Sequence, residues 1–142
     1  MDTEIEIIQQ WISKSVENLA QELMLEIQNN KTAGKIRFGV RGERENAIIG
    51  YISYTPHSDP NEESIEIAIN IKMKRNTVSF LADICWSDGE ILKEIDSVNL
   101  TYNSRSDLLP KLKMSWERIV PNIREKMKSL INLERPPRYR VD

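Results

Sequence analysis

The sequence predicts an α+β fold in which two helices cover one face of a five-stranded antiparallel meander. Two long segments, 3–29 and 107–131, carry apolar residues three and four positions apart. Between them, residues 35–100 alternate apolar and polar side chains with a period of two. Each helix has one apolar stripe and the sheet has one strongly apolar face. We therefore expect a two-layer sandwich in the order α-β-β-β-β-β-α.

Length and composition restrict the class of protein. The chain has 142 residues, which predicts one domain over 1–132 followed by an extended basic tail over 133–142. With 39% hydrophobic and 30% charged residues, the composition is too polar for a membrane protein. The acidic first ten residues do not resemble a secretory signal, so we expect a soluble cytoplasmic protein. A net charge of −2 gives no general attraction to nucleic acid.

The first helix is expected over 3–29. Thr3 and Glu6 match a capping box, in which each side chain reaches the backbone N–H of the other residue. The helix carries one continuous apolar stripe, made of Ile5, Ile8, Ile12, Val16, Leu19, Leu23 and Ile27.

The first two strands are the least regular part of the predicted sheet. Ile36, Phe38 and Val40 share one face of the first strand, and Gly42 indicates a turn. The second strand is expected over 46–54, and the polar, proline-containing stretch 55–64 is typical of a loop.

The third and fourth strands form the clearest hairpin in the chain. If Arg75 and Asn76 form a two-residue loop, position i pairs with position 151 − i. Every resulting pair on one face is apolar, which stabilises a sheet. These pairs are Met73–Val78, Ile71–Phe80, Ile69–Ala82, Ile67–Ile84 and Ile65–Trp86.

The fourth and fifth strands should be joined by a type I′ turn at Asp88-Gly89. That turn pairs Trp86 with Ile91 and Ala82 with Ile95, but the alternation then fails before Val98 and Leu100. One extra residue near Asp96-Ser97 restores the phase, so we predict a β-bulge there. Phe80 then pairs with Val98, and Val78 with Leu100.

The last helix is expected over 107–131 with Asp107 as its N-cap, which places Pro110 in the first turn. Pro121 lies inside the apolar pattern and should kink or split the helix. The predicted stripe consists of Leu109, Leu112, Trp116, Ile119, Ile123, Met127 and Leu130.

Several chemistries are excluded by residue counts. Cys85 is the single cysteine and His57 the single histidine, so neither an intrachain disulfide nor a two-histidine metal site can form in one chain. Phosphate-binding glycine motifs are absent from the sequence. We therefore predict no catalytic residue, no cofactor and no metal, and expect that the protein is not an enzyme.

Three residue groups still allow a chemical interpretation. His57 lies near Asp59, Glu62 and Glu63, as a metal ligand or a general base could, but the spacing matches no known ligand pattern and a solvated loop is the simpler interpretation. Glu66 and Asp83 fall on the second face of the sheet, where paired carboxylates could exchange protons. Solvent-facing polar residues are the simpler interpretation. Cys85 is expected to be a half-buried small residue.

Charge is distributed unevenly along the chain. Residues 1–30 hold six acids and one lysine, whereas residues 105–142 hold ten bases and five acids. The simpler interpretation is that the acidic first helix lies beside the basic last helix. The alternative is that the two ends recognise different partners.

These observations favour a small non-enzymatic module that binds another protein, such as an inhibitor, an immunity-type or antidefence factor, or an accessory subunit. Nucleic acid and membrane are not expected as partners, and a homodimer is compatible with the sequence. The expected contact residues are basic or lie on the second face of the sheet: Lys72, Lys74, Arg75, Leu81, Asp83, Arg135, Arg138, Tyr139 and Arg140.

The alternative function is a carrier of a small apolar ligand. Its pocket would lie between the sheet and the helices, lined by Trp11, Phe80, Trp86 and Trp116. The competing interpretation is that these four aromatic residues fill the core.

Overall fold

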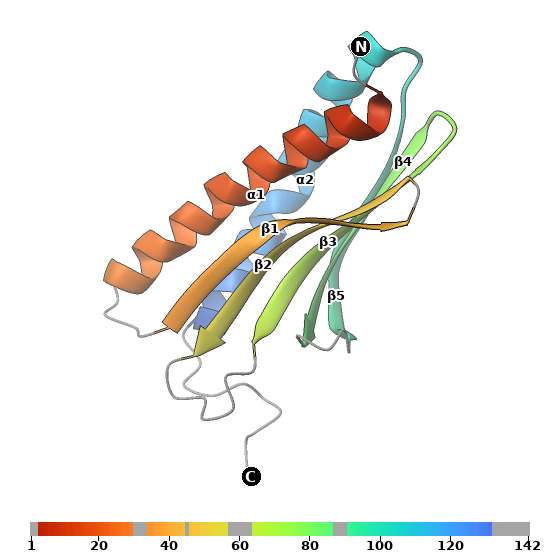
Figure 1. Ribbon diagram of the computed structural model, residues 1–142. Coiled ribbons are helices and arrows are strands. Elements are labelled where there is room, and N and C mark those ends of the chain that lie inside the picture. Colours follow the sequence, from red (N-terminus) through yellow and green to blue (C-terminus); the bar gives the residue numbers. More distant parts are fainter. Residues whose placement is uncertain (1–2, 30–33, 45, 57–63, 87–90, 132–142) are drawn as a thin grey trace.

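A computed structural model describes residues 3–29, 34–44, 46–56, 64–86 and 91–131. The element order confirms the predicted fold class (Figure 1). The sheet is antiparallel with the strand order β1-β2-β3-β4-β5. The elements are α1 (Glu4–Asn29), β1 (Gly34–Arg44), β2 (Ala47–Pro56), β3 (Ile65–Lys74), β4 (Thr77–Trp86), β5 (Ile91–Thr101) and α2 (Arg105–Ile131).

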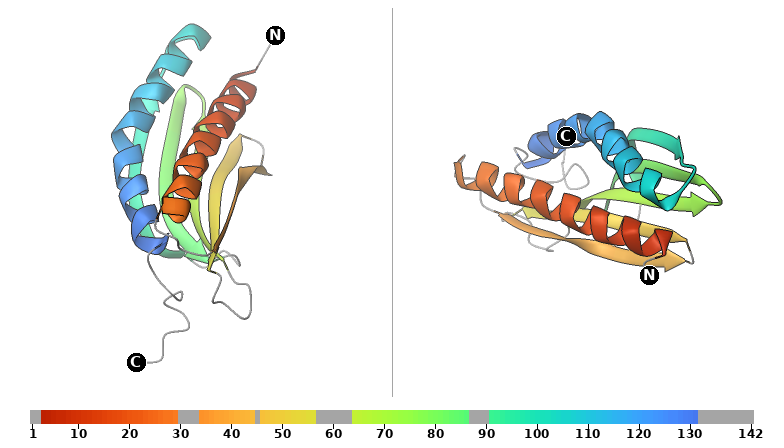
Figure 2. Two further views of the ribbon diagram at one scale, coloured as in Figure 1. Left: turned by 90° about the vertical axis from the view of Figure 1, so that its left-hand side faces the viewer. Right: turned by 90° about the horizontal axis from the view of Figure 1, so that it is seen from above.

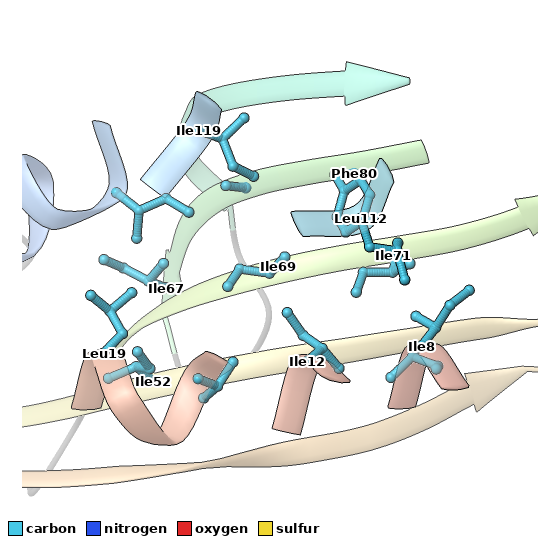
Figure 3. Packing of buried hydrophobic residues seen from close by; sticks show 14 of the residues in the cluster. Ile8, Ile12, Leu19, Ile52, Ile67, Ile69, Ile71, Phe80, Leu112 and Ile119 are labelled. Atoms are coloured by element: carbon cyan, nitrogen blue, oxygen red, sulfur yellow. The ribbon is translucent and has the colours of Figure 1, made fainter. Parts of the chain in front are cut away.

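Both helices lie on the same face of the sheet (Figure 2). α1 contacts β1 and β2, α2 contacts β5, and the two helices contact each other. Side chains from both helices and from the sheet meet in one core, part of which is drawn in Figure 3. Its fully buried members include Ile8, Ile12, Ile69, Ile71, Phe80, Leu108, Leu112, Ile119, Ile123 and Met127.

α1 begins as its capping sequence predicts. The Glu6 backbone N–H donates to Thr3 Oγ1 at 3.3 Å, which is one half of the expected capping box. Farther along, α1 lies close to β2 at Gly50, where an added Cβ would be 3.0 Å from the side chains of Ile12 and Val16. The absence of a side chain at Gly50 therefore allows this close packing.

The prediction of a turn at Gly42 is wrong. β1 continues to Arg44, with a register shift between Gly42 and Arg44, and β2 extends to Pro56. Asn46 precedes β2 with a φ of 66°, a left-handed conformation that asparagine tolerates better than most residues. Its carbonyl oxygen also accepts a hydrogen bond from the Met73 N–H at 2.9 Å, which ties this turn to β3.

The hairpin of β3 and β4 is confirmed residue by residue. The observed pairs run from Ile65–Trp86 to Lys74–Thr77 in the predicted register. Arg75 adopts a φ of 54°, as a two-residue turn of this kind requires.

The pairing of β4 with β5 is confirmed in part. Phe80 lies opposite Val98 and Val78 opposite Leu100, as predicted. The bulge, however, comes earlier than expected, since Glu94 pairs with Asp83 and Asp96 with Ala82, which leaves Ile95 as the extra residue.

The reason for the earlier bulge lies in the last helix. With Ile95 as the extra residue, Asp96 faces α2, and its Oδ2 accepts a hydrogen bond from Asn122 Nδ2 at 2.8 Å. A second register shift sets Ile91 opposite Cys85, so the predicted pair with Trp86 is also wrong. Asp88-Gly89 lies outside the described residues.

α2 begins two residues earlier than predicted, at Arg105. Asp107 is therefore in the first turn and is not the N-cap. Its Oδ2 accepts a hydrogen bond from the Asn103 N–H at 3.1 Å. Pro110 accordingly falls in the second turn. One residue of the predicted stripe is also wrong, because Leu108 is 0% exposed whereas Leu109 is 36% exposed.

Pro121 does not split the last helix. α2 continues through both Pro110 and Pro121 to Ile131. Figure 2 shows it curving along the sheet, as expected of a helix that contains proline.

Candidate functional site

The turn between β3 and β4 presents three exposed cations. Lys72, Lys74 and Arg75 form no ion pair within the part of the chain that the structure describes. Tyr102, which follows β5, anchors this turn. Its N–H donates to the Asn76 carbonyl at 3.0 Å, and its hydroxyl donates to the Arg75 carbonyl at 3.2 Å. These cations therefore lie on an anchored turn, without a counter-charge among the side chains that the structure describes.

The second face of the sheet, which is the face that carries no helix, has an ion pair that links β1 to β3. Arg41 donates from both terminal nitrogens to Glu66, at 2.9 and 3.2 Å, and its guanidinium lies 4.7 Å from the centre of the Tyr51 ring. The hydrogen bond with Glu66 raises the pKa of Arg41, an effect that desolvation partly opposes. This geometry is typical of a bidentate pair, which fixes orientation as well as charge.

The expectation that Glu66 and Asp83 face solvent is wrong. They are 8% and 3% exposed, because side chains on this face cover one another around a small apolar cluster of Ile49, Ala68 and Cys85. Burial raises the pKa of the Asp83 carboxyl, a hydrogen bond from Asn70 Nδ2 at 3.1 Å opposes that rise, and the charges of Glu94 and Glu66 add to it.

Burial changes what Asp83 can contribute to a partner contact. The same Asn70 Nδ2 also donates to the Leu81 carbonyl at 3.2 Å. Asp83 would therefore act by positioning Asn70 beside the half-buried Leu81, and not by touching a partner. The roles of Leu81 and Asp83 in binding stay predictions.

Cys85 is buried more deeply than expected. Its Sγ lies 3.6 Å from Glu66 Oε2, and desolvation together with nearby carboxylates raises the pKa of the thiol to about 12. A thiol with so high a pKa is a poor nucleophile at neutral pH.

The buried carboxylates have structural partners. Glu66 is bound by Arg41 and Asp83 by Asn70. Within the described residues, no group of three or more histidine, cysteine, aspartate or glutamate side chains could hold a metal ion. His57 lies outside those residues, so its proposed roles stay predictions.

The aromatic residues named for a ligand pocket pack against one another. Trp11 meets Phe80 edge to face at 5.9 Å between ring centres and Trp116 at 5.8 Å. A cavity between sheet and helices, lined by Leu23, Ile52, Tyr54, Ile65, Ile67 and Met127, measures only about 10 Å³. These contacts place Phe80 in the core, with Trp11 and Trp116 half-buried against it, and leave no enclosed ligand cavity among the described residues between sheet and helices. The side chain of Trp86 is outside the description.

The acidic first helix lies beside the basic last helix, as the simpler interpretation of the charge pattern expects. Arg105 Nε donates to Glu4 at 2.6 Å near the beginning of both helices. Arg124 Nε donates to Glu22 at 2.8 Å farther along. Two ion pairs thus hold the helices together at separate points.

Between these ion pairs the helices leave an open groove. Its wider part measures about 680 Å³ and is lined by Ile7, Gln10, Trp11, Arg105, Ser106, Leu109, Pro110 and Lys113. A narrower hollow of about 220 Å³ shares Trp11 and Lys113 with it and extends to Arg124. We call the wider part the helix groove.

Sequence reasoning missed the helix groove. Leu108 and Leu109 are adjacent, and only Leu108 faces the core, whereas the predicted stripe contained Leu109. In α1, the half-buried Ile7 likewise lies directly before the buried Ile8, so two adjacent apolar residues again face different directions. Such adjacent apolar pairs on both helices could have indicated an apolar surface outside the core.

Four of the expected contact residues cannot be placed. Arg135, Arg138, Tyr139 and Arg140 lie outside the described residues. Neither protein-family models nor curated proteins nor solved structures gave a match to this chain. None of the helices, as far as they are described, combines the length and the apolar character needed to cross a membrane.

Proposed function

We propose that this chain is a non-enzymatic module that binds another protein, and that the helix groove is its main docking site. The observation that carries the proposal is the apolar lining of the groove, in which Leu109 is 36% exposed and Trp11 half-buried. Its volume of about 680 Å³ is within the roughly 300–1,000 Å³ of typical binding clefts. Exposed apolar patches of this kind mark interaction sites in soluble domains.

The charges around the groove specify the partner's chemistry. The two charged residues in its lining are both cations, Arg105 and Lys113. Arg105 is paired with Glu4, whereas Lys113 forms no ion pair with any described residue. The groove therefore suits a protein segment that places a bulky apolar side chain next to aspartate or glutamate.

The basic turn is a second feature that suits an acidic partner. The turn between β3 and β4 lies at the end of the sheet where both helices begin (Figure 1). Lys72 and Lys74 alternate with the buried Ile71 and therefore lie on the face of the sheet that carries no helix. A partner that contacts both the groove and these cations would have to extend past this end of the sheet.

The biological roles that fit this proposal are those of an inhibitor, an immunity-type or antidefence factor, or an accessory subunit. A cytoplasmic location belongs to the proposal, and the free thiol of Cys85 is consistent with a reducing compartment.

The test is selection from a random peptide library displayed against the whole chain. We expect enrichment of peptides that combine a large apolar residue with acidic neighbours. Leu109→Asp should weaken their binding by at least about tenfold. Met114→Asp is the matched control, because Met114 is 70% exposed on α2 and does not line the groove.

Three results would overturn the proposal. One is a library that yields no saturable binder. Another is a set of binders whose affinity is the same for wild type and Leu109→Asp. Loss of binding in both the Leu109 and the Met114 variants would also contradict it, because the effect would then not be specific to the groove.

A further inference from the structure

The outer edge of β1 is a second, separate feature of the molecule. β1 pairs with β2 along one side, in an unbroken register from Gly34 to Gly42. It is the first strand in the sheet order, and no described residue pairs with its other side. Its unpaired backbone N–H and C=O groups can therefore accept another strand.

The opposite edge of the sheet is protected. β5 contains two register shifts in its pairing with β4, which distort an edge for strand addition. Side chains of α2 also reach it, since Lys111 Nζ donates to the Thr101 carbonyl at 2.7 Å and Asn122 donates to Asp96. Between Gly34 and Gly42, β1 has neither a register shift nor a hydrogen bond from a described helix side chain, so its edge is the more open of the two.

The side chains of β1 specify what could pair with it. Lys35 and Arg37 are exposed and share the second face of the sheet, and neither forms an ion pair with a described residue. Phe38 lies on the helix side of the same strand and is 38% exposed. A strand added here would meet cations on one face and apolar surface on the other.

A second copy of this chain is a poor occupant. When the β1 edges of two copies pair antiparallel, the helix-covered faces of both sheets must lie on the same side. Three registers then align most of residues 34–42 of one copy with residues 34–42 of the other. They set Arg37 opposite Arg37, Lys35 opposite Arg41, or Arg37 opposite Arg41. Like charges directly opposite each other destabilise a sheet, so all three registers are disfavoured.

We propose that β1 binds an extended segment of another protein by strand addition, and that this segment alternates acidic and apolar residues. The acidic residues would lie beside Lys35 and Arg37, and an apolar residue would cover Phe38. Main-chain hydrogen bonds would supply the affinity, and the alternation would supply the specificity. This inference does not depend on the helix groove.

The test uses a capped heptapeptide of alternating glutamate and valine and the isotope-labelled whole chain. Saturable chemical-shift changes should centre on β1, and the β1 amides that face the free edge should exchange with solvent at least about tenfold more slowly. Lys35→Glu/Arg37→Glu should lose this binding and gain binding to a peptide of alternating lysine and valine. Lys93→Glu on β5 is the control and should leave it unchanged.

Leu109→Asp separates this proposal from the helix groove. Peptide binding that survives Leu109→Asp supports strand addition, whereas binding abolished by it would place the peptide in the groove and overturn strand addition. Absence of saturable shifts, shifts without slower β1 exchange, or protection of β1 through self-association at high concentration would each overturn it as well.

Discussion

Arg41 binds Glu66 through two hydrogen bonds of 2.9 and 3.2 Å, on the face of the sheet that carries no helix. The pair joins the edge strand β1 to the central strand β3 across β2. Because Glu66 is only 8% exposed, Arg41 provides the counter-charge for a nearly buried carboxylate. Arg41 is thereby held in place, which leaves Lys35 and Arg37, among the described side chains of β1, as the cations available to a partner.

Arg41→Ala should destabilise the fold by about 1–3 kcal/mol, because Glu66 would stay buried without its charged partner. The free energy of unfolding in urea would measure the effect. Arg124→Ala is the matched control, since Arg124 also makes two hydrogen bonds to a carboxylate but that of Glu22 is 51% exposed. Its cost should be below about 1 kcal/mol. Equal costs for the two variants would contradict this account.

Cys85 should resist thiol reagents in the folded protein. A pKa of about 12 leaves roughly one thiol in ten thousand ionised at pH 8, and the residue is 5% exposed. Labelling with Ellman's reagent should therefore proceed only as fast as the protein unfolds, and should be immediate in guanidinium chloride. Rapid labelling under native conditions would show that the sheet face opens far more often than its burial implies.

Asp83→Asn should stabilise the protein at neutral pH and have less effect in acid. Burial raises the pKa of Asp83, so the folded state holds this proton more tightly than the unfolded state. The resulting stability is fully present below the unfolded pKa and is lost as the pH rises through the folded pKa. Melting temperatures of wild type and variant should therefore diverge with rising pH. The exposed Glu125→Gln serves as a control, and parallel curves for Asp83→Asn would refute the assignment.

Local signals predicted the sheet better than they predicted the second face. Arg75-Asn76 fixes the pairing of β3 with β4 because a two-residue loop permits a single register and every core-facing pair in it is apolar. The burial of Asp83 depends instead on side chains of neighbouring strands, among them Asn70 of β3, which donates to the Asp83 carboxylate. Contacts among three strands depend on side-chain conformations, which the alternation of residue types does not determine.

The choice between Leu108 and Leu109 shows how a one-residue error moves a functional prediction. These residues lie four and three positions before the buried Leu112, so helical spacing allows either of them on the core face. The structure buries Leu108 and leaves Leu109 in the lining of the helix groove, a distinction that depends on packing against the sheet.

Alanine substitutions at these two leucines test this assignment directly. Leu108→Ala should cost about 2–5 kcal/mol, because it empties space in the core where Leu108 is 0% exposed. Leu109→Ala should cost less than about 1 kcal/mol, since alanine is the best helix former and Leu109 is 36% exposed. Urea denaturation of both variants would measure the difference. Similar losses would place both leucines in the core and remove the main support for the helix groove.

Arg75→Gly should stabilise the β3–β4 hairpin by up to about 1 kcal/mol. Arg75 has a φ of 54°, a conformation that costs most residues about 1–2 kcal/mol and glycine almost nothing, while glycine's extra freedom in the unfolded state offsets part of the gain. Arg75→Val should be destabilising, because a β-branched side chain fits this conformation poorly. Thermal unfolding of both variants provides the comparison. A higher melting temperature for Arg75→Gly would mean that arginine is kept in this turn at the expense of stability, as a residue that contacts a partner would be. A lower melting temperature for Arg75→Gly would show that the arginine side chain itself stabilises the turn.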